Sequence, residues 1–253
     1  MPLQIHQFAC LSDNYGFLAH DLASGQTACM DTPDADAVLA ALKATGWTLN
    51  LILNTHWHPD HAGGNAKIKA ATGATTIGPQ EVEKISPLDR IVVGGDRVVL
   101  GETEFAVIDT GGHTLGHVSY YSAKDQTVFV GDTLFALGCG RLFEGTPDQM
   151  WASLSRIAAL PDETVVYCAH EYTASNARFA LSLDDSPELA QRADAIFAAR
   201  ARGEATVPTQ IGVEKATNPF LRPRALAGAM GLGGQSDVAV FAALRAAKDG
   251  FKA

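Results

Sequence analysis

The feature that most limits how this chain can fold is a continuous apolar run, LNLILNT, at residues 49–55. A strand that is apolar on both faces needs cover on both faces, as happens in parallel sheets with layers on each side. Just before it, Asp34 is placed to cap a helix over AVLAALKA, and Gly46 is placed to end that helix. A helix that leads into a buried strand is typical of α/β proteins, so we expect this fold class.

The pattern of apolar residues changes along the chain near residue 171. Beyond residue 171 the apolar spacing is helical and no strong strand run intervenes, whereas 208–223 is irregular and remains unassigned. We therefore expect an α/β domain at residues 1–170 and a helical domain at residues 171–253. The predicted strands are 3–9, 15–21, 27–31, 49–55, 118–123, 127–133 and 164–170, with a hairpin over 96–110 that turns at Gly101 and Glu102. The predicted helices are 37–44, 64–73, 147–160, 172–183, 186–201 and 236–251.

Composition and charge exclude several classes of function. A net charge of -9 repels phosphate at long range, which argues against a nucleic-acid partner or an anionic membrane surface. The first residues have no basic or apolar stretch typical of a secretory signal, and the 4 cysteines lack C-x-x-C spacing. We expect a cytoplasmic monomer with reduced, buried thiols.

The loop after the apolar run concentrates residues that bind metals. In THWHPDH, His56 and His58 are two residues apart, so an extended backbone projects them to the same side. Pro59 keeps His58 out of helical geometry, and Asp60 and His61 follow where the chain turns into the next helix. Imidazole and carboxylate suit Zn, Fe or Mn, and no thiolate is part of the loop. The sequence therefore predicts a metal site here, with two glycines after it that allow close approach of backbone.

Three later segments, GGHTLGH, GDT and CAHEY, carry the same residue types after predicted strands. Because the carboxyl ends of parallel strands meet at one crevice, we expect them to join the histidine loop. Spacing does not decide between His113 and His117, and Asp132 taken alone fits a turn residue more readily than a ligand. Asp31 fits equally a partner of a ligand histidine or a turn cap. The donors outnumber the three protein ligands of one catalytic zinc, which predicts two ions bridged by a carboxylate.

With THWHPDH, GGHTLGH, GDTLFALGCGRLFEGT and CAHEYTASN taken together, the chain resembles the metallo-β-lactamase superfamily and, within it, the glyoxalase II family of hydroxyacylglutathione hydrolases. The likeness extends over nearly the whole chain, including KATNPFLR and LRAAKDGFK. The H-x-H-x-D-H signature is specific for the superfamily only, and the narrower likeness rests on the other motifs. The resemblance implies a four-layer αβ/βα sandwich with a C-terminal helical domain that helps to bind glutathione.

The resemblance also implies roles for the candidate donors. It favours His117 over His113 as a ligand. It implies a first metal ion on His56, His58 and His117, a second on Asp60, His61 and His170, and a bridge through Asp132. Zinc is the expected metal, with iron or manganese as alternatives, because the ligand set accepts all three.

The same resemblance implies the contacts to glutathione. By matching each motif, these are Arg141, Phe143, Tyr172, Asn176, Arg245 and Lys248. The family often has tyrosine where this chain has Phe143, so a hydroxyl contact is missing and we expect weaker affinity rather than a lost reaction. From spacing alone, Arg245 and Lys248 fit the solvated face of a last helix better than a binding site.

The activity that the resemblance implies is hydrolysis of S-(2-hydroxyacyl)glutathione, typically S-D-lactoylglutathione, to D-lactate and glutathione in methylglyoxal detoxification. Two metal ions lower the pKa of a shared water so that hydroxide can attack the thioester. Asp60 and Asp132 are the candidate catalytic residues, although ligation makes Asp60 a poor base. A lactonase, a β-lactamase or an iron-dependent persulfide dioxygenase would share the histidine loop. The basic C-terminal segment favours a small glutathione thioester as the partner.

Overall fold

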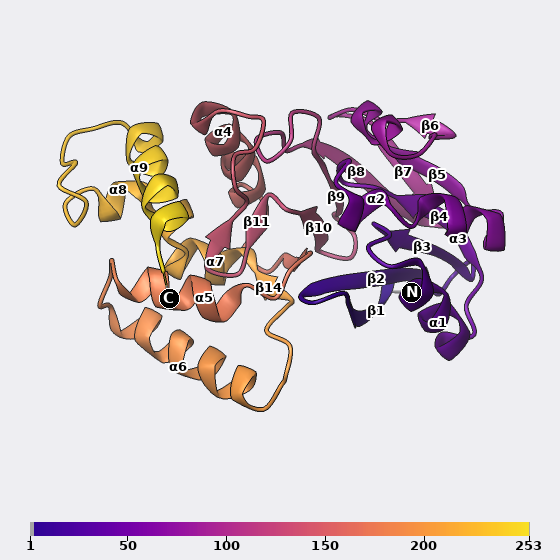
Figure 1. Ribbon diagram of the computed structural model, residues 1–253, viewed down its shortest axis with the longest axis horizontal. Coiled ribbons are helices and arrows are strands. Elements are labelled where there is room, and N and C mark those ends of the chain that lie inside the picture. Colours follow the sequence, from indigo (N-terminus) through magenta and orange to yellow (C-terminus); the bar gives the residue numbers. More distant parts are fainter. Residues whose placement is uncertain (1–2, 253) are drawn as a thin grey trace. The chain divides into compact units, whose positions relative to one another are not determined.

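The computed structural model describes residues 3–252 and forms two compact units (Figure 1). The first unit comprises Met1–Thr110 and Gly116–Gly131, and the second comprises Gly111–Leu115 and Asp132–Ala253. The outermost residues of the two predicted domains, 1–2 and 253, lie outside the described residues.

The first unit contains a six-stranded sheet in the order β1-β2-β3-β4-β5-β6. Its first three strands pair antiparallel, and β3 to β6 pair parallel. The parallel half is the one that contains the apolar run, as its composition predicted. The strands are β1 (Leu3–Cys10), β2 (Asn14–Asp21), β3 (Gln26–Met30), β4 (Leu49–Leu53), β5 (Thr75–Gly78) and β6 (Arg90–Ile91).

Helices cover one face of this sheet. The side chain of Asp34 accepts hydrogen bonds from the first turn of α1 (Ala35–Thr45), and Gly46 ends the helix in the left-handed conformation, both as predicted. Val38 and Leu42 of this helix pack with Ile52 of β4 in one buried cluster. The other helical segments of this unit are α2 (Pro59–Ala62), α3 (Asn65–Thr72) and the 3₁₀ turn η1 (Gln80–Lys84).

Four further strands of the first unit form an antiparallel array in the order β10-β9-β8-β7. Phe129 from this array lies 5.9 Å from Phe17 of β2, measured between ring centroids. Tyr120 donates a hydrogen bond of 2.9 Å to the carbonyl of Asn54, directly after β4. These contacts bury the second face of the first sheet. The strands are β7 (Arg97–Leu100), β8 (Thr103–Asp109), β9 (Val118–Ser122) and β10 (Thr127–Gly131).

The second unit is mainly helical. Thr146 and Gln149 form a reciprocal capping box at the start of α4, and α5 and α6 pack through a cluster that includes Ala177 and Leu189. Two short antiparallel strand pairs also belong to it: the hairpin of β11 with β12, and β13 with β14, which are joined through α5 and α6. The helices are α4 (Pro147–Ala158), α5 (Thr173–Leu181), α6 (Pro187–Ala201), α7 (Ile211–Thr217), η2 (Pro219–Leu221), α8 (Pro223–Leu226) and α9 (Asp237–Gly250). The strands are β11 (Leu134–Phe135), β12 (Gly138–Cys139), β13 (Val165–Cys168) and β14 (Thr209–Gln210).

The predicted elements agree with the structure to within a few residues, but several short ones were missed. Each missed element is brief, and the segment left unassigned at 208–223 contains β14, α7 and η2. Such short strands and helices contain too few residues to show a periodicity in the sequence, because packing and not propensity determines where they form. No helix among the described residues is long and apolar enough to cross a membrane.

Candidate functional site

The histidine loop of the first unit is held where the apolar strand β4 ends. His58 has extended backbone (φ -58°, ψ 146°) and immediately precedes α2, in which Pro59 is the first residue. This confirms the conformation that the proline predicted for His58. Asp60 and His61 lie in the single turn of α2.

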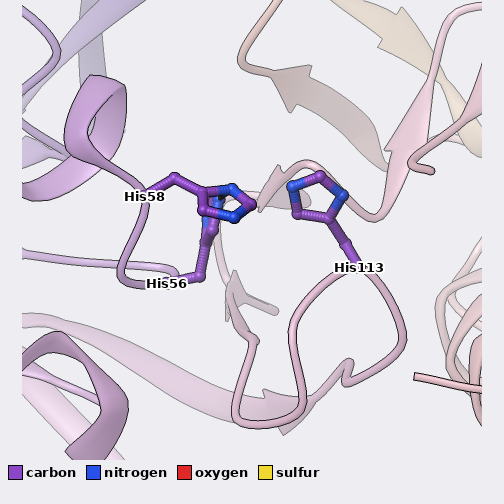
Figure 2. Close-up of side chains that lie close together, drawn as sticks. All are labelled: His56, His58 and His113. Carbon is purple, nitrogen blue, oxygen red and sulfur yellow. Dashed lines mark hydrogen bonds between the residues drawn. The ribbon is translucent and has the colours of Figure 1, made fainter. Parts of the chain in front are cut away.

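The imidazoles of this loop face one another in the first unit. The ring centroid of His56 lies 4.7 Å from that of His58, 4.0 Å from that of His61 and 4.8 Å from that of His117. His56 Nε2 and His58 Nδ1 are 3.0 Å apart. Figure 2 shows the rings of His56 and His58 side by side at the end of the loop. His56, His61 and His117 are buried, so their ring nitrogens need partners within the protein.

His117 reaches the loop through an antiparallel hairpin, not through the parallel strands that the sequence suggested. Val118 at the start of β9 donates a backbone hydrogen bond to Thr55, next to His56. Because β9 and β10 are antiparallel, the start of one and the end of the other lie at the same edge. Parallel pairing in the described part of the first unit is confined to β3–β6. The expectation that parallel strands bring the segment GGHTLGH to the histidine loop was therefore wrong, because β8 and β9 on either side of it are antiparallel.

Asp31 holds the histidine loop from behind. Its Oδ2 accepts a hydrogen bond from His61 Nδ1 at 2.8 Å, and its Oδ1 accepts one from the backbone N–H of Thr55 at 2.7 Å. Thr55 Oγ1 also donates to Asp31 and lies 3.0 Å from His56 Nδ1. With the proton on Nδ1, His61 presents the lone pair of Nε2 as a ligand. Of the two alternatives for Asp31, the structure therefore has the histidine partner, while Asp34 caps the helix.

Asp60 is half-buried and is held by a residue that sequence reasoning missed. Asn14 donates through Nδ2 to Asp60 Oδ2 at 3.2 Å, and His61 Nε2 lies 3.7 Å from the same oxygen. The two glycines after the loop allow a close approach, but to backbone rather than to a ligand: Gly64 donates to Thr32 O, and a Cβ on Gly64 would lie 2.7 Å from that oxygen.

The second unit brings three further donors together. His113 Nε2 lies 3.4 Å from Asp132 Oδ2, and His170 Nε2 lies 3.3 Å from Asp132 Oδ1. All three side chains are at least nine-tenths buried. His113 Nδ1 donates to the carbonyl of Arg141 at 2.9 Å, which leaves the lone pair on Nε2, and His170 stacks on Tyr172. The two oxygens of Asp132 thus face two different imidazoles.

The two histidines that spacing did not separate have different surroundings. His117 Nδ1 lies 2.9 Å from Thr110 Oγ1 in the first unit, whereas His113 accompanies Asp132 in the second. Groups of histidine and aspartate that can hold a metal ion occur among the described residues, and His117 belongs to none of them. Their members are His56, His58, Asp60, His61, His113, Asp132 and His170.

A cavity of about 410 Å³ lies within the second unit. It contains every residue that the resemblance assigned to glutathione, together with the candidate donors His113 and Asp132. The sequence reasoning did not place Phe135, Cys139, Ser175 and Phe251 in such a site. Phe135 and Cys139 belong to the motif GDTLFALGCGR that had already been noted, so their position in it was the available signal. The cavity is lined by His113, Asp132, Phe135, Cys139, Arg141, Phe143, Tyr172, Ser175, Asn176, Arg245, Lys248 and Phe251.

Basic side chains from two segments give this cavity positive charge. Arg245 is buried, donates to the carbonyl of Cys139 at 2.9 Å and pairs with Asp249 at 2.8 Å. It does not lie on a solvated helix face, as spacing alone had suggested. Lys248 donates to Ser175, and its burial, together with the positive charge of Arg245, lowers the pKa of its amine to about 8.

Sequence comparison agrees with this arrangement. A family model described as the metallo-beta-lactamase superfamily matches residues 22–170, and one described as the hydroxyacylglutathione hydrolase C-terminus matches residues 171–251. The hydroxyacylglutathione hydrolase of Erythrobacter litoralis is 58% identical, over 98% of this chain and 100% of its own length. That of Maricaulis maris is 55% identical, over 98% of this chain and 99% of its own.

This chain belongs to the hydroxyacylglutathione hydrolase family. Among solved structures, ETHE1 from Myxococcus xanthus superposes with a TM-score of 0.67 at 28% identity and covers 98% of each chain. TTHA1623, solved in a di-iron-bound form, has a TM-score of 0.63 at 25% identity and covers 86% of this chain and 100% of its own. The predicted α/β sandwich of the metallo-β-lactamase fold, with a helical C-terminal region, is confirmed. So is the prediction of a hydrolase.

Proposed function

We propose that this protein hydrolyses the thioester of S-(2-hydroxyacyl)glutathione, with S-D-lactoylglutathione as the expected substrate, to a 2-hydroxy acid and glutathione. The observation that carries the proposal is the cavity of the second unit, because it gathers all the side chains assigned to glutathione from segments far apart in sequence. Relatives that are more than half identical over nearly their whole length carry the name hydroxyacylglutathione hydrolase.

The chemistry of the cavity suits the tripeptide. Its volume of about 410 Å³ falls within the range typical of small-molecule sites. Glutathione has two carboxylates, and Arg141 and Lys248 offer charge-assisted hydrogen bonds in an otherwise acidic protein. Tyr172, Phe135 and Phe251 supply apolar surface for the rest of the molecule.

The donor set fits divalent metal ions. Buried imidazoles whose other ring nitrogen is bonded to a carboxylate or a carbonyl, as in His61 and His113, are oriented as metal ligands are. The chain carries several such histidine and aspartate groups. We propose two ions, zinc first and iron or manganese as alternatives, since the ligand types accept all three. One solved structure of similar fold, TTHA1623, was determined in a di-iron-bound form.

We further propose how the donors are shared. Asp132, with one oxygen toward His113 and the other toward His170, has the arrangement of a bridging carboxylate. This supports His113, rather than His117, as the third histidine of the first ion. The proposed sets are then His56, His58 and His113 for one ion, Asp60, His61 and His170 for the other, and Asp132 for both.

Comparing His113→Ala with His117→Ala tests that assignment. If His113 is the ligand, its replacement removes about one metal ion per chain by elemental analysis. His117→Ala should then retain both ions. Loss of metal only from His117→Ala would restore the assignment that the resemblance implied.

The bound ions would supply Lewis acidity and lower the pKa of water at the thioester. The chain's residues provide position and affinity. The Asp31 carboxylate fixes His61, and Asn14 fixes Asp60, which we propose orients the attacking water. Glutathione leaves as a thiolate, whose parent thiol has a pKa of about 8.5, so no strong general acid is needed.

We propose that residues 1–170 carry the catalytic donors and that residues 171–253 carry most of the glutathione contacts. We also propose that the protein is a cytoplasmic monomer. Two family models that meet at residues 170 and 171 support this division of labour.

The function is tested on the purified, metal-replete protein with S-D-lactoylglutathione, a lactone, a β-lactam and glutathione persulfide as parallel substrates. We expect hydrolysis of the thioester in preference to the other three, and loss of activity on chelation with recovery on adding zinc. Oxygen uptake with the persulfide, or hydrolysis of the lactone alone, would overturn the proposal in favour of those enzymes.

A further inference from the structure

A very short hairpin forms part of the wall of the cavity. Strands β11 and β12 pair only through Leu134 with Cys139 and Phe135 with Gly138. Phe135 and Cys139 line the cavity. Two strands of two residues each are not stable by themselves. Other parts of the second unit must therefore hold the hairpin in place.

Side-chain amides from two later helical segments bind the backbone of this hairpin. Asn218 Nδ2 donates to Phe135 O at 3.1 Å and to Gly138 O at 3.0 Å. Asn176 Nδ2 donates to Ala136 O at 3.1 Å. Bonds to backbone atoms fix where the hairpin lies without depending on the identity of its side chains.

The buried carboxylate of Glu214 connects these contacts. Its Oε2 accepts from the backbone N–H of Leu137, in the turn of the hairpin, at 2.9 Å and from Asn218 Nδ2 at 2.9 Å. Its Oε1 accepts from Thr209 Oγ1 at 2.5 Å and from the guanidinium of Arg192. Glu214 is fully buried, and four donors, one of them the Arg192 guanidinium, satisfy both of its oxygens.

We infer that Glu214 and Asn218 are positioning residues for the substrate, an inference that rests on the proposed function. Neither is among the described residues that line the cavity. They hold the hairpin so that Phe135 and Cys139 form the wall against which glutathione binds. Because the hairpin contacts the substrate away from the reacting thioester, disturbing its support should change the affinity for substrate. Loss of a metal donor should instead change the rate of the chemical step.

Two substitutions disturb this support in different ways. Glu214→Gln replaces one acceptor oxygen by an N–H group that faces other donors, and leaves Arg192 without its anion. Asn218→Ser is milder. A serine can still accept the hydrogen bond from Phe220 N that Asn218 accepts in the structure, but it is too short to reach both hairpin carbonyls.

Asp184→Asn provides a matched control in the same unit. Asp184 forms a mostly buried ion pair of 2.6 Å with Arg222 and accepts a hydrogen bond from the backbone N–H of Ser186, and both partners lie outside the hairpin. Loss of this ion pair should lower the melting temperature without changing the affinity for glutathione.

The experiment measures KM and kcat for S-D-lactoylglutathione, Kd for glutathione by calorimetry, metal content and melting temperature. For Glu214→Gln and Asn218→Ser we expect KM and Kd to rise about tenfold, with kcat within about threefold of wild type and both metals retained. Asp184→Asn should keep wild-type KM and Kd.

Unchanged KM and Kd in Asn218→Ser, beside a lowered melting temperature, would overturn the positioning role, and this variant decides the test if Glu214→Gln does not fold. An active wild type is required for that reading. A wild type that neither hydrolyses the thioester nor binds glutathione would instead overturn the proposed function, and this role with it.

Discussion

The histidine loop and the cavity of the second unit are built in opposite ways. The loop takes His56, His58, Asp60 and His61 from six consecutive positions at the end of one strand. The cavity takes its side chains from segments as distant as Phe135 and Phe251. One depends on local backbone geometry, and the other on how helices pack.

The difference determines what a substitution should do in each place. We propose that His56, His58, Asp60 and His61 of the loop are metal ligands, so the loss of one of them should remove chemistry. In the cavity, many side chains share the contact with one ligand, so the loss of one weakens affinity and leaves the reaction intact. Substitutions in the loop and in the cavity test that contrast.

Replacing His58 by alanine should remove a metal ligand and lower kcat/KM by at least about 1,000-fold. Elemental analysis and the thioester assay measure both effects. His20→Ala is the control, because His20 lies in β2, stacks on Trp47 and bonds to Thr27. If His58→Ala keeps its metal and activity, the loop does not carry the chemistry.

Replacing Asp31 by asparagine should weaken metal binding by about 10- to 100-fold, because Asp31 orients His61 without being a ligand. Competition with a chelator measures the affinity. Asp34→Asn, at the cap of α1, should leave it unchanged. Equal effects of the two changes would show that Asp31 matters only for folding.

The affinity for substrate should fall as pH rises through about 8, since burial and the neighbouring Arg245 and Arg141 lower the pKa of the Lys248 amine to about 8. Below that pH the amine is protonated and attracts a carboxylate, and above it this charge is lost. Lys248→Met should raise KM about tenfold at neutral pH and abolish this step in a plot of KM against pH. A step of the same size in the variant would assign the titration to another group.

Restoring a hydroxyl with Phe143→Tyr should have the smallest effect, lowering KM by about threefold or less. Phe143 is exposed and lies edge-on to His113, so a hydroxyl added to its ring has solvent as an alternative partner. A change in kcat larger than the change in KM would contradict a purely binding role.

The same contrast explains how much the sequence could predict. His58 before Pro59, the cap at Asp34 and the long strands follow from local preferences, and the structure contains them. The cavity residues came from resemblance to a family, since spacing alone favoured a solvated Arg245 that is in fact buried. Glu214 carried no signal, because a carboxylate in a helical segment is ordinarily exposed and only packing reveals its four donors.

Asp31 adopts a left-handed backbone conformation, with φ 57°. Glycine would relax that backbone, so a search for more heat-resistant variants would favour glycine at this position. The gain would come at the expense of the carboxylate that orients His61. Thermal stability therefore favours glycine at position 31, whereas metal binding favours aspartate. A stabilising substitution at this position would be expected to weaken metal binding.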